Sequence, residues 1–174
     1  MEVAAVTLAR QANAAAEEGD WRRASELYAA TAQQAQPDTQ GWARAVYHAW
    51  NARCHASSCD NFFCRCNGCV ALPEMPEWMK SPQSLMAIAA RVVAAEPAHP
   101  DSWVMNACVN PSTASQSWRR AAKLYQESGN AGQVTHLRYA KSCLEQAQGG
   151  AGGEQAQEAM IMAKPLKMRS WWRR

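Results

Sequence analysis

Five of the seven cysteines fall in one short stretch, and their spacing is the closest thing in the chain to a chemical site. They are Cys54, Cys59, Cys64, Cys66 and Cys69. Cys66 and Cys69 are separated by two residues, a spacing at which two thiolates reach one tetrahedral ion, and the other three can supply further ligands. Zinc is the metal that such a site favours. The alternative is a set of free or incidentally oxidised thiols, because the spacing matches no pair of separated CxxC motifs.

No motif indicates catalysis. The glycine-rich run 149–153 follows a predicted helix and lacks the Lys-Ser/Thr pair of a phosphate-binding loop. The sequence contains no HExxH and no nucleophile elbow, and the four histidines belong to no recognisable catalytic pattern. We therefore expect a protein that is not an enzyme and that needs no cofactor, with zinc as the single exception to test.

The rest of the chain has the composition of packed helices. Alanine is abundant, whereas β-branched residues and Phe are scarce, which favours helices and predicts almost no strand. The predicted helices cover residues 2–18, 21–36, 42–53, 82–94, 118–130 and 134–148, with a short one opened by Trp103 and another at 154–163. The tryptophans of these helices are expected in the core, with Trp50 left as the exception.

Turn and cap residues separate these helices. Gly19 suits a left-handed position after the first helix, and Asp20 is a good cap for the second. Pro37 ends the second helix, and Ser81-Pro82 starts another with cap and first-turn residues in the preferred order. Between them, residues 54–80 are predicted to form an irregular, cysteine-rich insertion.

One pattern of small and aromatic residues recurs along the chain. The first unit has Ala12 and Ala15, the Gly19-Asp20 turn, Ala24 and Tyr28, and Pro37. The strongest match is later, where Trp118, Ala122, Tyr125 and Gly129 follow one another as a Trp, a small residue, a Tyr and a turn Gly within a single helix and its end. Over residues 2–148 this pattern resembles the tetratricopeptide repeat family. The resemblance implies an all-α fold of antiparallel helix pairs, in about three units, stacked as an α-solenoid.

In the resembled family, the first helix of each unit lines a concave groove that binds peptides. The resemblance therefore implies a scaffold that binds a peptide or protein surface within a larger complex. The residues at the groove positions are Asn13, Arg44, Tyr47, His48 and Asn51. The alternative is an ordinary solvated helix face. A clamp for a C-terminal carboxylate is not expected, because Ala9 stands where a lysine would be needed.

The chain is predicted to have two parts, the helical domain 1–148 with its insertion at 54–80, and a glycine-rich linker with a tail at 149–174. The tail is basic and contains tryptophan, which suits an anionic membrane surface, RNA or a docking role. Its candidate contact residues are Lys167, Arg169, Trp171, Trp172 and Arg173. Two less favoured hypotheses for the function of the whole chain are a zinc or redox module built on the cysteines and an RNA-binding helical repeat.

Charge and hydropathy narrow the range of partners. The net charge is +3, but residues 164–174 hold five basic and no acidic residues, so the remainder is slightly acidic and unsuited to nucleic acid. No apolar run is long enough to span a bilayer, and the N-terminus lacks a secretory signal. With an odd number of cysteines, this predicts a cytoplasmic or other reducing intracellular location. The oligomeric state and the partner are not predicted.

Overall fold

The structure, a computed structural model, describes residues 2–57, 72, 74–128 and 133–149. In these residues the chain is all-α, with seven α-helices and two short 3-10 helices and without a strand. The α-helices are α1 (Glu2–Glu17), α2 (Trp21–Gln34), α3 (Gln40–Ala56), α5 (Pro82–Ala95), α6 (Pro100–Val109), α7 (Ala114–Glu127) and α8 (Gln133–Gly149). The 3-10 helices are η1 (Glu77–Met79) and η2 (Pro111–Thr113).

The predicted caps are confirmed. Gly19 has a φ of +80°, and the Asp20 side chain accepts a hydrogen bond from the Arg23 amide at the start of α2. Ser81 forms a reciprocal capping box with Ser84, and Pro82 is the first residue of α5. These local signals fix where helices begin because each satisfies amide groups that the helix itself leaves without acceptors.

Several predicted boundaries are shifted in the structure, and two of these shifts change the interpretation. Helix α3 runs to Ala56, so Cys54 lies in its last turn and not in an irregular loop. Helix α7 begins at Ala114, four residues before Trp118. Both helices extend because no Gly or Pro interrupts them at the predicted ends. The predicted helix at 154–163, the tail and four of the five clustered cysteines lie outside the described residues.

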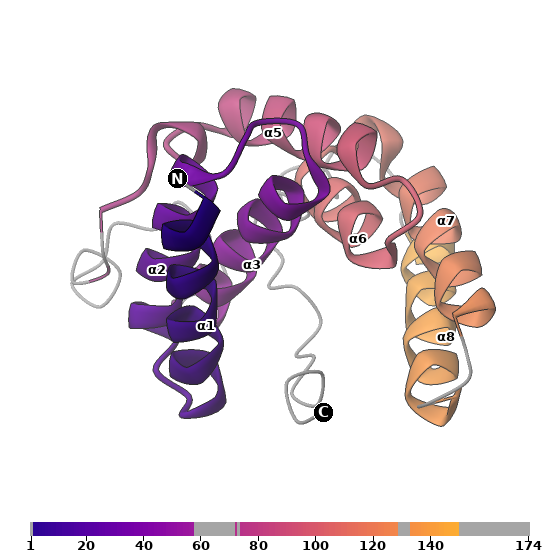
Figure 1. Cartoon of the computed structure of the whole chain (residues 1–174). Coiled ribbons are helices and arrows are strands. Elements are labelled where there is room, and N and C mark those ends of the chain that lie inside the picture. The colour runs from indigo at the N-terminus through magenta and orange to yellow at the C-terminus, as the bar shows by residue number, and fades with distance from the viewer. Residues whose placement is uncertain (1, 58–71, 73, 129–132, 150–174) are drawn as a thin grey trace.

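The helices follow one another around an arch (Figure 1). Helices α1 and α2 form one leg, α5 crosses the top, and α7 and α8 form the other leg. Each helix packs against the helix before it, and α3 also contacts α6. Helix α6 packs on α7 as well as on α5, and η2 connects it to α7.

Small side chains allow the helices to approach closely. Buried alanines such as Ala12, Ala24, Ala43 and Ala49 belong to one continuous core cluster. The Ser25 hydroxyl of α2 donates to the backbone carbonyl of Ala49 in α3 at 3.1 Å, a contact that only closely spaced helices permit. The core is thus built by backbone proximity as much as by large apolar groups.

The tryptophans of the core are not the predicted set. Trp50 was expected outside the core but is only 2% exposed, whereas Trp21 and Trp103 are half-buried. Trp42 and Trp118 are buried, as expected. Trp50 lies four residues after the buried Val46 and eight after Trp42, so it faces the same side of α3. None of the helices in the described part is both long and apolar enough to cross a membrane.

Candidate partner-binding site

The five predicted groove residues divide into a reachable and a buried group. Asn13 and Arg44 are exposed and His48 is half-buried, whereas Tyr47 and Asn51 are buried. The residues that a partner can reach are therefore Asn13, Arg44 and His48. Their role as partner contacts stays a prediction.

Asn13 is tied to the rest of the set through Tyr28 of α2. The Tyr28 hydroxyl donates to Asn13 Oδ1 at 2.6 Å, and the Tyr28 ring lies 5.1 Å from the His48 ring between centroids. Because the amide oxygen of Asn13 already accepts this bond, its Nδ2 group is the part that can serve a ligand, as a donor. Burial, and then the nearby Glu17 carboxylate, raise the pKa of Tyr28, which therefore stays a neutral donor.

His48 is an uncharged imidazole at neutral pH. Burial, followed by the neighbouring His99 and Arg44, lowers its pKa to about 3. Its ring contacts two tyrosines, Tyr28 and Tyr47, at centroid distances of 5.1 and 5.2 Å. An aromatic, neutral group at this point offers a flat surface to a partner and not a positive charge.

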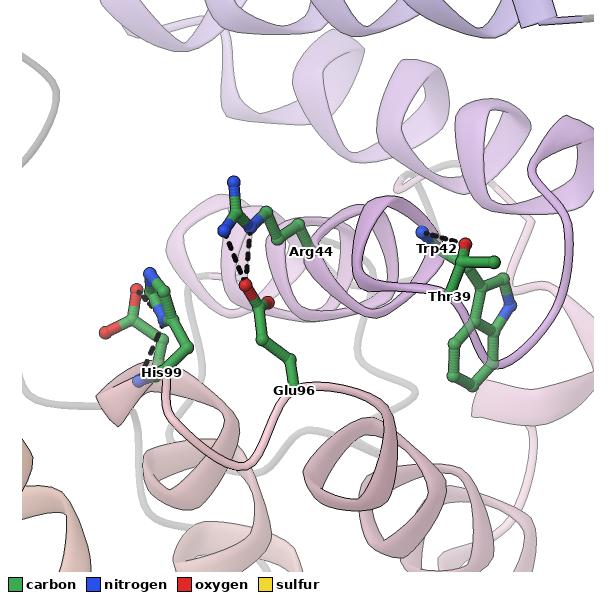
Figure 2. A network of polar contacts seen from close by, with 6 residues as sticks. Thr39, Trp42, Arg44, Glu96 and His99 are labelled. Atoms are coloured by element: carbon green, nitrogen blue, oxygen red, sulfur yellow. Dashed lines mark hydrogen bonds and ion pairs between the residues drawn. The ribbon is translucent and has the colours of Figure 1, made fainter.

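Arg44 is held by a carboxylate from a distant part of the chain (Figure 2). Its Nε and Nη2 atoms lie 2.7 and 2.6 Å from one oxygen, Oε1 of Glu96, at the end of α5. The Arg44 side chain is 56% exposed and that of Glu96 only 5%. The hydrogen bond to Glu96 is the main cause that raises the pKa of Arg44. The guanidinium has five N–H donors, so others remain for a ligand.

His99 caps the helix that follows this turn. Its Nδ1 accepts a hydrogen bond from the Asp101 amide at 3.3 Å, so the imidazole proton of the neutral ring is on Nε2. Asp101 Oδ2 is 3.8 Å from the same Nδ1 atom, beyond hydrogen-bonding distance. Because the nitrogen that faces the carboxylate acts as an acceptor, this is not the oriented His–Asp pair of an acid–base catalyst.

We call this set the polar strip: Asn13, Tyr28, Arg44, His48, Glu96 and His99. It joins α1, α2 and α3 to the turn between α5 and α6. Tyr28, Glu96 and His99 were not among the sequence-based site residues, since their relation to Asn13 and Arg44 arises from packing. The strip presents hydrogen-bond donors from Asn13 and Arg44 beside an aromatic surface, which suits recognition of carbonyl oxygens.

Of the five clustered cysteines, only Cys54 is among the residues that the structure describes. Cys54 is buried in the last turn of α3, and the neighbouring His55 ring stacks on Trp21 at a centroid distance of 4.6 Å. Cys59, Cys64, Cys66 and Cys69, and the tail residues Lys167, Arg169, Trp171, Trp172 and Arg173, lie outside the described residues. Within the described ranges, no group of three or more His, Cys, Asp or Glu residues is arranged to hold a metal ion.

Comparison of the chain with models of known protein families, with curated proteins and with solved structures found no match.

Proposed function

We propose that this chain is a non-catalytic scaffold that binds an extended peptide along the polar strip. The observation that carries the proposal is the pair of exposed donors, Asn13 and Arg44. Each makes a hydrogen bond within the chain that leaves further N–H donors of the side chain for a ligand. A peptide backbone offers carbonyl oxygens at regular intervals, and these are the acceptors such a surface would bind.

The order of the helices supports a repeat architecture similar to the tetratricopeptide family. Each helix packs on its predecessor, as the helices of an α-solenoid do. In this interpretation the units are α1–α2, α3–α5 and α7–α8, and the short helix α6 lies between the second and the third.

The proposal can be tested by selecting binders from a random peptide library displayed on phage, with the full-length chain as bait. Enriched peptides would be synthesised and their dissociation constants measured by fluorescence anisotropy. Arg44→Ala and Asn13→Ala should each weaken binding about tenfold, since each removes at least one hydrogen bond, charged in the case of Arg44. Arg119→Ala, at an exposed arginine of α7, is the matched control and should leave binding unchanged.

Two results would count against the proposal. One is that no peptide is enriched over a bait that has been unfolded. The other is that enriched peptides bind the Arg44 and Asn13 variants as tightly as the original chain, which would place the contact elsewhere.

Zinc binding by the cysteines is a second proposal. The observation in its favour is that Cys54 lies in the last helical turn of α3, so a rigid element would position the first ligand of the set. Native mass spectrometry of protein purified without added metal or reductant tests it. A mass increment of one zinc ion, lost when Cys66 and Cys69 are changed to serine, would support the site. A bare chain with seven free thiols would exclude it.

RNA or membrane contact by the tail is the weakest proposal, since the residues before the tail carry a slightly acidic net charge. Deletion after Gly153 should abolish any such affinity without affecting peptide binding by the strip.

A further inference from the structure

Two arginine ion pairs connect α3 and its preceding turn to α5. In the first, Arg91 of α5 binds Asp38 in the turn before α3, with Nε–Oδ1 and Nη2–Oδ2 distances of 2.9 and 3.0 Å. In the second, Arg44 of α3 binds Glu96 at the end of α5. Each of the two segments thus contributes one arginine and one carboxylate.

The partners in these pairs are distant in the sequence but close in space. Asp38 and Arg91 are 53 residues apart, and Arg44 and Glu96 are 52 apart. Both pairs join the beginning of α3 to the end of α5. The Arg91 guanidinium also lies over the Trp42 ring, 4.9 Å from its centroid, which places it against the first turn of α3.

The backbone at the two acidic residues of these pairs has a defined conformation. Asp38 has a φ of 60° and is the one non-glycine residue of the described chain with a positive φ. Aspartate tolerates this conformation better than most residues, yet it is still uncommon. At the other end, Glu96 accepts a hydrogen bond from the His99 amide at 3.2 Å through its backbone oxygen, so the turn that holds its carboxylate also leads into α6.

Helix α3 packs extensively on α2 but more sparsely on α5 and α6. The angle between the α1–α3 part and the α5–α8 part of the arch therefore depends on few elements. We propose that the Asp38–Arg91 and Arg44–Glu96 pairs act together as one salt-sensitive clamp that fixes this angle. Because Arg44 and Glu96 belong to the polar strip, the clamp also sets the separation of the two sides of the strip.

This gives the candidate site a means of regulation. A partner that binds the remaining N–H groups of Arg44 would leave the ion pair with Glu96 in place and hold the guanidinium in its clamped position, which would make the arch more rigid. This last step rests on the proposed function. The clamp itself does not, so it can be tested without any partner.

Hydrogen exchange measured by mass spectrometry on the full-length chain distinguishes one clamp from two independent ion pairs. The variants are Asp38→Asn and Glu96→Gln, which keep the side-chain shape, and asparagine also accepts a positive φ. If the pairs act together, either variant should accelerate exchange about tenfold in both segments, 38–44 and 91–99. Wild-type protein in 0.5 M salt should show the same change in part, because exposed ion pairs are screened.

Lys123→Ala is the control, since it removes the exposed Lys123–Glu127 pair within α7 and should leave both segments unchanged. A double variant that combines Asp38→Asn with Glu96→Gln should have a larger radius of gyration than the wild type, measured by small-angle X-ray scattering. Acceleration confined to the segment whose own carboxylate was changed, with an unaltered radius of gyration, would overturn the proposal. The peptide selection described above remains informative in either case.

Discussion

The hydroxyl of Tyr125 in α7 donates a 2.6 Å hydrogen bond to Oδ1 of Asp101 in α6, and both residues are buried. Burial, followed by the Asp101 carboxylate, raises the pKa of Tyr125, so the tyrosine remains the donor. A neutral hydroxyl thus gives the buried Asp101 carboxylate a charge-assisted hydrogen bond, which joins α6 to α7.

Tyr125→Phe should destabilise the protein, because it removes a donor from the buried Asp101 carboxylate. The expected loss is about 1–3 kcal/mol, measured by urea unfolding followed by circular dichroism. Tyr28→Phe is the matched control. It removes a hydroxyl of the same kind, but the acceptor on Asn13 is exposed and can bond to water. Equal losses in the two variants would show that burial of Asp101 does not govern the effect.

Stability should fall in acid because of His48, whose pKa is lowered from 6.5 to about 3 in the folded chain. Below pH 6.5 the unfolded chain binds a proton that the folded chain does not, so folding loses up to about 1.4 kcal/mol per pH unit down to pH 3. Above pH 6.5 this contribution is fully present. His48→Gln should flatten that part of the profile between pH 6.5 and 5. The free energy of unfolding is measured by urea titration of both proteins at several pH values. If it decreases equally steeply with falling pH in the wild type and in His48→Gln, the assignment to His48 is wrong.

Cys108 in α6 and Cys143 in α8 should be unreactive in the folded protein. Burial raises the pKa of each thiol to about 12, with a smaller effect from a neighbouring acidic group. The thiolate is the reactive form, so at pH 8 both residues should react with iodoacetamide at least a hundredfold more slowly than in denaturant. Tandem mass spectrometry of labelled peptides measures this directly. Rapid labelling of either residue in native buffer would indicate that α6 and α8 separate readily.

Two glycines in different conformations predict opposite effects of the same substitution. Gly19 has a φ of +80°, whereas Gly41 lies in the first turn of α3, and an added Cβ would meet no atom within 4 Å at either position. Gly19→Ala should destabilise the chain by about 1 kcal/mol, because a left-handed conformation is strained for alanine. Gly41→Ala should stabilise it by roughly 0.5–1 kcal/mol. Thermal unfolding of both variants provides the test, and a change of the same sign would refute the backbone explanation.

The sequence by itself determined the local structure. Gly19, Asp20, Ser81 and Pro82 mark helix ends because their own side chains or φ preferences satisfy the terminal turns, and those ends are confirmed. The alanine-rich composition likewise predicted an all-helical chain, which the described residues confirm. The burial of Trp50 also follows from the sequence, since its spacing from Val46 and Trp42 places it on the core face of its helix.

Only the tertiary structure decided how the candidate site is assembled. Arg44 was identified from the pattern, but Glu96, 52 residues away, is its partner because α5 folds back along α3. Tyr47 and Asn51 share the helical spacing of the exposed Arg44 and the half-buried His48 yet are buried, since a position along one helix does not reveal which neighbour covers it. Helical periodicity specifies a face. The packing of distant helices determines what that face meets, and a single sequence carries no local signal for that arrangement.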